Sequence, residues 1–182
     1  RYKVVNNDCP NKKRKPIPRK VLRYLPFLPR LQRLFMQPEF AKHMRWHMEG
    51  NRENPGMMVH PGDSESWKSF NEDGFASDSR NFKLVKSSDG FNPFNFGLTQ
   101  YSCWPVFLDP LNLPPALCLK TQNIFLSMVI PGPKGPGKNF NVYMEPLYDE
   151  LKLAWAGVPT YDSFLKQNFN MRVTLHTTVH DC

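Results

Sequence analysis

The stretch 169–181, FNMRVTLHTTVHD, decides the fold, because its apolar and polar residues alternate strictly. The apolar positions of one parity are Phe169, Met171, Val173, Leu175 and Val179. Successive side chains of a β-strand point to opposite faces, so the alternation predicts a strand with one buried face. Asp181 shares the parity of the apolar set and stands at the end of this predicted strand.

Upstream of this strand, the sequence predicts three more strands and a helix. The strands are residues 81–89 (NFKLVKSSD), 101–108 (YSCWPVFL) and 123–130 (NIFLSMVI). Pro105 cannot donate a backbone hydrogen bond, so it requires a bulge or an unpaired position in its strand. The predicted helix begins near Pro146 and carries an apolar stripe through Leu147, Leu151 and Trp155.

The order strand, strand, strand, helix, strand predicts an α/β domain with a partial ribonuclease H-like fold (β-β-β-α-β). In that fold, the first three strands form an antiparallel meander, and a crossover helix returns the fourth strand parallel to the first. The first strand ends at Asp89 and the last at Asp181. We therefore expect these two aspartates side by side at one end of the sheet.

Two neighbouring carboxylates are suited to binding the divalent cations used in phosphoryl transfer. Oxygen ligands favour Mg²⁺ or Mn²⁺ over zinc, so the hypothesis assigns Asp89 and Asp181 as catalytic residues and metal ligands. The alternative is that each aspartate simply forms a turn at the end of its strand, as aspartates often do.

Three segments are expected: a basic arm at 1–20, an α-helical region at 21–77, and the α/β domain at 78–182. The chain has 24 Lys and Arg against 16 Asp and Glu, a formal net charge of +8, and the positive charge is concentrated before residue 53. Such a basic head predicts DNA binding, a nuclear import signal, or a solvated surface. The candidate DNA-binding residues are Lys12, Lys13, Arg14, Lys15, Arg19 and Lys20.

The remaining candidate ligands point to structural roles. Cys9, Cys103, Cys118 and Cys182 have no CxxC spacing, and Cys103 and Cys118 are expected to be small buried thiols. His43 and His47 lie four residues apart on a predicted helix over 39–49, but packing or surface roles are favoured over a metal site. No apolar run could span a membrane, so a protein of a reducing intracellular compartment is expected.

Several motifs resemble the catalytic region of CACTA (En/Spm-like) plant DNA transposases, in the same order and with similar spacing. They include HPGDSESWKSF (60–70), FASDSRNFKLVKSSDGFNPF (75–94), YSCWPVFLDPLNLPPALCLK (101–120) and MVIPGPKGPGKNFNVYMEPLYDELKLAW (128–155). The resemblance implies a cut-and-paste transposase with a ribonuclease H-like DDE/D core that acts on terminal inverted repeats in the nucleus. Asp89, in SDGFNPF, matches the family's first catalytic aspartate, and Asp181 matches the second.

The chain also departs from the family pattern. The third acidic residue of the family lies farther downstream, so a truncated transposase fragment that is inactive by itself is expected. Its expected partner is DNA, and a transposase oligomer is a second possible partner. Asp109 stands where relatives have a non-acidic residue, and it is assigned no role. The alternative function is that of a non-catalytic, transposon-derived DNA-binding protein or relic.

Overall fold

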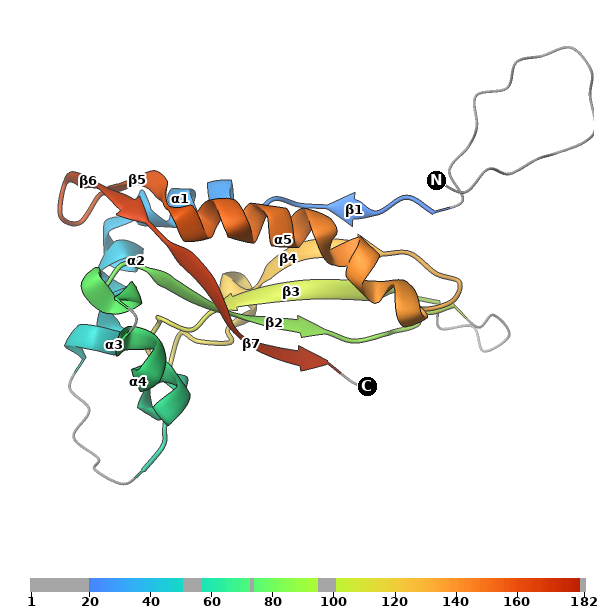
Figure 1. The fold of residues 1–182 in the computed structure, drawn as a ribbon, viewed down its shortest axis with the longest axis horizontal. Coiled ribbons are helices and arrows are strands. Elements are labelled where there is room, and N and C mark those ends of the chain that lie inside the picture. The colour runs from blue at the N-terminus through green and yellow to red at the C-terminus, as the bar shows by residue number, and fades with distance from the viewer. Residues whose placement is uncertain (1–19, 51–56, 73, 95–100, 181–182) are drawn as a thin grey trace, which may run out of the picture.

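The computed structural model describes residues 20–50, 57–72, 74–94 and 101–180 (Figure 1). They form a mixed α/β structure around a five-stranded sheet, with strand order β1-β4-β3-β2-β7. The sheet strands are β1 (Arg23–Tyr24), β2 (Phe82–Ser88), β3 (Trp104–Pro110), β4 (Phe125–Ile130) and β7 (Val173–His180). Only the β2–β7 pair is parallel among these pairings, so the sheet is mostly antiparallel.

The sheet confirms the predicted pairing. Strand β2 pairs with β3 on one side and with β7 on the other, and β3 pairs with β4. Helix α5 (Phe140–Ala156) connects the β4 end of this meander to the segment that leads into β7. The order of three antiparallel strands, a helix and a strand parallel to the first is therefore present in the described residues.

The alternating stretch that begins at Phe169 was predicted as a single strand, and this prediction is wrong. It is divided between β6 (Gln167–Met171), which forms a hairpin with β5 (Val158–Asp162), and β7. The register with β2 also shifts after Leu175, so that Thr177 lies opposite Val85 and His176 is an extra residue. A bulge reverses the parity of the residues that follow it, which explains why Val179 is 58% exposed.

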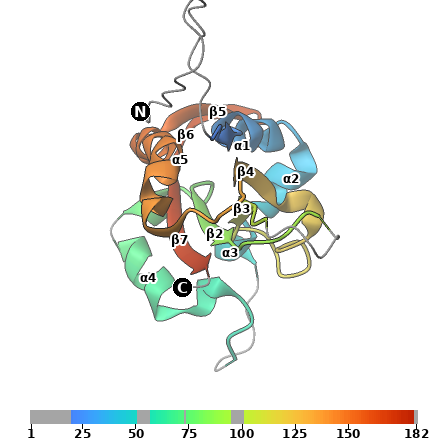
Figure 2. The same ribbon diagram turned by 90° about the vertical axis from the view of Figure 1, so that its right-hand side faces the viewer.

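One apolar core joins the sheet to the helices on one of its faces. Helix α1 (Leu28–Phe35) contributes Leu31 and Phe35, and α5 contributes Leu147, all fully buried against the sheet. Figure 2 shows α1 and α5 on the same side of the sheet. Because the N-terminal helix and the sheet share this core, they pack as one unit in the described residues; the proposed boundaries at 20 and 77 stay a prediction.

The opposite face of β2 is covered by α4 (Glu65–Glu72). Lys83 alternates with the core residues of β2, and its ammonium lies 3.9 Å from the centre of the Trp67 ring. The same ring makes an edge contact with His176, 5.2 Å between ring centres. Burial disfavours the charged form and lowers the pKa of Lys83 to about 8. The contact with the aromatic ring offsets part of this loss of hydration.

Several element boundaries differ from the predicted ones. The helix predicted to start near Pro146 begins six residues earlier, and Pro146 lies inside it. Proline removes the hydrogen bond to the carbonyl of Val142, a residue that is 60% exposed and open to water. The helix predicted over 39–49 is divided into α2 (Pro38–His43) and α3 (Trp46–Glu49).

Two buried asparagines connect the start of β2 to the start of β7. The Asn112 carboxamide accepts a hydrogen bond from Lys83 N at 2.8 Å and donates one to the Asn81 carbonyl at 2.7 Å. Asn81 in turn accepts from Arg172 N, at 2.9 Å, immediately before β7. The polar motifs around these residues, RNF and NLPP, therefore set the alignment of the two parallel strands.

Candidate active site

Asp89 follows the last residue of β2, as predicted, and its side chain is exposed. One carboxylate oxygen accepts a hydrogen bond from Gly90 N at 2.6 Å. None of the ion pairs between described residues involves Asp89. Its carboxylate therefore remains available for a cation at the end of the sheet.

The neighbouring strand β7 runs beside β2 up to this point. In the parallel register, Ser88 is paired with His180, the last residue of β7. These two residues immediately precede the two predicted catalytic aspartates. Asp181 lies outside the described residues, so its position beside Asp89 stays a prediction.

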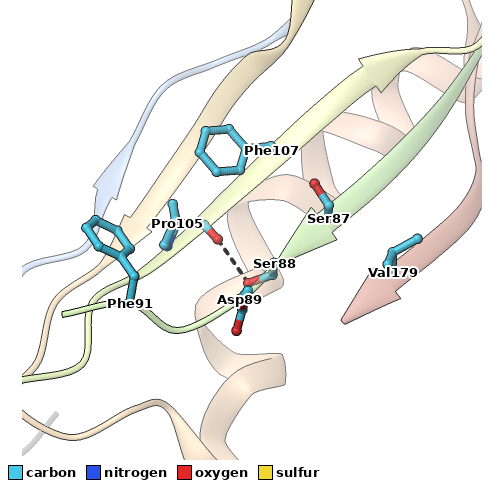
Figure 3. A pocket seen from close by; sticks show the side chains of 7 residues that line it. All are labelled: Ser87, Ser88, Asp89, Phe91, Pro105, Phe107 and Val179. Atoms are coloured by element: carbon cyan, nitrogen blue, oxygen red, sulfur yellow. Dashed lines mark hydrogen bonds between the residues drawn. The ribbon is translucent and has the colours of Figure 1, made fainter. Parts of the chain in front are cut away.

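Asp89 borders a cavity of about 350 Å³ (Figure 3). The side chains that line it come from the ends of β2, β3 and β7 and from the turn after β2: Ser87, Ser88, Asp89, Phe91, Pro105, Phe107 and Val179. The Ser88 hydroxyl donates to the Pro105 carbonyl at 3.0 Å, which is the dashed line in Figure 3. The cavity is thus largely apolar, with a carboxylate at its rim.

A tightly packed tryptophan supports the turn that holds Asp89. A Cβ atom added to Gly90 would lie 2.7 Å from the indole of Trp104, and one added to Gly135 would lie equally close to it. The indole N–H donates to the Ser102 hydroxyl at 2.7 Å. The two glycines permit this close packing, a role that the sequence pattern did not indicate.

Lys20 is the one predicted DNA-binding residue that falls within the described residues; Lys12, Lys13, Arg14, Lys15 and Arg19 lie outside them. The Lys20 ammonium donates to the Lys134 carbonyl at 2.9 Å. It lies at the same end of the sheet as Asp89, in the loop that leads into β1. The described part of the chain therefore places one basic residue of the arm near the candidate site.

His43 and His47, four residues apart in the sequence, lie on separate helices. His47 is buried, with its ring 5.5 Å from that of Trp67 and its Nδ1 within hydrogen-bond distance of Asn112, and it belongs to a different helix from His43. Among the described residues, no group of three or more His, Cys, Asp or Glu side chains could hold a metal ion. Cys103 and Cys118 are free and only partly buried, less so than expected.

Asp109 is a buried carboxylate outside the predicted site. It lies in β3 opposite Val85, is 4% exposed, and its Oδ1 atom has no hydrogen-bond partner among the described residues. Burial raises the pKa of Asp109 from 3.8 to about 6. An unpartnered buried carboxylate destabilises the fold once it is ionised.

The substitution Asp109→Asn is expected to increase the free energy of unfolding at pH 7 by about 1–2 kcal/mol. The raised pKa means that the folded chain binds the proton more tightly than the unfolded chain between pH 3.8 and about 6. The contribution of the Asp109 carboxyl to the free energy of unfolding is therefore fully present below about pH 4 and is lost as the pH rises through 6. Urea unfolding at pH 4 and pH 7 measures the change; an identical pH dependence in both proteins would contradict it.

Comparison with known families identifies the chain. The family model described as "Transposase family tnp2" matches residues 55–182, which include all of the cavity and both predicted catalytic aspartates. The chain belongs to the tnp2 transposase family. No curated protein and no solved structure matches it. Family membership implies DNA binding, and none of the helices in the described ranges has the length and apolarity needed to cross a bilayer.

Proposed function

We propose that this chain is the catalytic region of a cut-and-paste DNA transposase of the CACTA (En/Spm-like) type, with a ribonuclease H-like core. The observation that carries the proposal is the parallel β2–β7 register, which ends with Ser88 opposite His180. If both strands continue for one more residue, Asp89 and Asp181 stand side by side. The strand order and the tnp2 family support the same assignment.

The residues fit a divalent metal through the chemistry of their side chains. Asp89 offers an exposed carboxylate with no cationic partner among the described residues, and Asp181 would supply the second. Mg²⁺ or Mn²⁺ bound there would stabilise the charge that develops on phosphate oxygens during strand cleavage and transfer. The protein's own part is to hold the two carboxylates at the ends of paired strands.

The substrate would be DNA at the terminal inverted repeats of a transposon, and the site of action the nucleus. The apolar wall around Asp89, with Phe91, Phe107 and Val179, would exclude water from one side of the bound phosphate. The basic arm before β1 would supply further contacts to the DNA backbone. These contacts carry affinity without sequence preference.

Manganese titration tests the catalytic assignment. The unchanged chain is expected to bind Mn²⁺ weakly, because a pair of carboxylates gives few ligands, and Asp89→Asn is expected to reduce that binding at least tenfold, by roughly 1.4 kcal/mol or more. Free Mn²⁺ is measured by its electron paramagnetic resonance signal, and Asp149→Asn is a matched control because Asp149 is exposed on α5. Equal binding by the unchanged chain and Asp89→Asn would remove the catalytic assignment and leave a DNA-binding protein.

A further inference from the structure

A second hollow lies at the same end of the sheet, beside the candidate active site. Its volume is about 470 Å³, and it is formed by the loop before β1, the end of β4 and the two segments that follow β2 and precede β3. We call it the basic–aromatic groove, and its lining includes Lys20, Arg23, Phe94, Tyr101 and Gly132. None of the described residues that line it is acidic.

Two cations give the groove its charge. Arg23 is exposed on the edge strand β1, opposite Val129 of β4. Lys20 is held in place by its hydrogen bond to the Lys134 carbonyl, which leaves its positive charge uncompensated. Neither Lys20 nor Arg23 takes part in an ion pair with a described residue. The groove therefore presents a positive surface suited to phosphate groups.

Two aromatic rings form the other wall. Phe94 is 51% exposed, although burial of a phenylalanine is favourable, and its ring lies edge-on to that of Tyr101 with 5.2 Å between ring centres. The Tyr101 ring packs so closely on the backbone that a Cβ atom on Gly132 would approach it to 2.7 Å. A closely packed tyrosine thus supports a phenylalanine that is half exposed to solvent.

The groove is joined to the Asp89 cavity through the backbone. Phe91, which lines the cavity, forms a β-bridge with Cys103, which lines the groove. Phe91 N donates to the Cys103 carbonyl at 2.9 Å, and Cys103 N donates to the Phe91 carbonyl at 2.8 Å. The same short ladder therefore forms a wall of both hollows, and a polymer bound in one would lie close to the other.

We propose that the basic–aromatic groove binds a single strand of DNA next to the active site. Lys20 and Arg23 contact its phosphates, and one unpaired base stacks on Phe94. Cationic side chains beside exposed aromatic rings are the features by which proteins bind single strands, because every base has a face that can stack. In duplex DNA that face is covered by neighbouring bases, so the groove distinguishes an unpaired strand from a paired one. This inference rests on the proposed function, since strand cleavage at transposon ends produces unpaired or frayed DNA.

Binding of a dye-labelled thymidine oligonucleotide of about 12 nucleotides, measured by fluorescence anisotropy with EDTA present, tests the groove. The substitution Phe94→Ala is expected to weaken single-strand binding roughly tenfold and duplex binding much less. Phe94→Trp, which keeps a stacking surface, should restore the affinity. The double substitution Lys20→Ala and Arg23→Ala should reduce the slope of log affinity against log salt by about 1.4, the value for two phosphates of a single strand.

The controls are matched to the groove residues by type and exposure. Tyr161→Ala removes an aromatic ring of β5 that is 41% exposed, and Lys120→Ala removes an exposed lysine between β3 and β4; both should leave the affinity unchanged. Single-strand binding by Phe94→Ala within about twofold of the unchanged chain, or equal losses for single strand and duplex, would overturn the proposal. The oligonucleotide is measured in EDTA and Mn²⁺ is titrated without DNA, so failure of the groove and failure of the catalytic assignment are separate results.

Discussion

The substitution Gly90→Ala is expected to lower the free energy of unfolding by about 2–3 kcal/mol, because a methyl group at this position collides with Trp104. The added Cβ would lie 2.7 Å from Cε2 of the indole and 2.9 Å from the Ser102 hydroxyl. The ring cannot move aside freely, since Gly135 already packs closely on it. Relief therefore requires the backbone after β2 to shift, and with it the adjacent Asp89.

Urea unfolding measures the loss, and Gly137→Ala is the control. Gly137 has a φ of +52°, and an added Cβ would meet no described atom within 4 Å apart from its chain neighbours, so its substitution costs about 1 kcal/mol in backbone conformation alone. Replacing Trp104 with leucine in the Gly90→Ala chain should recover part of the loss, as a coupled pair does in a double-mutant cycle. Additive effects of the two substitutions would show that the contact with Trp104 is not the cause of the destabilisation by Gly90→Ala.

The sheet could be predicted because its signals are local and repeated. The apolar positions of β2 and β4 alternate or cluster over six or seven residues, and a strand is recognisable at that length. The order of these elements then limits the topology, since a helix between strands favours a parallel return. For this reason the pairing of β2 with both β3 and β7 followed from the sequence.

The interruption near Arg172 could not be predicted, because its cause is distant in sequence. The strict alternation continues through this position, but Arg172 N donates to Asn81, and its guanidinium lies 4.6 Å from the Trp155 ring centre. The first contact is with the residue immediately before β2, and the second is with the last turn of α5. A pattern of period two identifies extended backbone but does not determine which strand each half pairs with.

The residues of the candidate site also divide into those that the sequence predicts and those that it does not. Asp89 was predictable from its place at the end of a strand and from its motif, whereas Trp104, Ser102 and Gly135, which support its turn, are separated from it by as many as 46 positions. The basic–aromatic groove combines residues from four separate segments of the chain, so no single motif indicates it. Sequence reasoning finds residues that act by their local position and misses those that act by packing.

Helix α1 is expected to depend on a carboxylate from a distant helix. It has no side-chain cap of its own; instead Glu150 of α5 accepts hydrogen bonds from Phe27 N at 3.1 Å and Leu28 N at 2.9 Å. The hydroxyl of Tyr24 donates to the same carboxylate, and burial, followed by this hydrogen bond, raises the pKa of Tyr24. A negative charge at a helix N-terminus satisfies free N–H groups and interacts favourably with the helix dipole.

Glu150→Ala should therefore lower the free energy of unfolding by about 3 kcal/mol, because it leaves two backbone donors and a tyrosine hydroxyl without their acceptor. Urea unfolding followed by tryptophan fluorescence measures the change. Glu145→Ala, on the exposed side of the same helix, is the matched control and should have little effect. Tyr24→Phe, which keeps the cap but loses the hydroxyl, should cost about 1 kcal/mol. If Tyr24→Phe were as damaging as Glu150→Ala, the hydroxyl contact rather than the helix cap would be what joins α1 to α5.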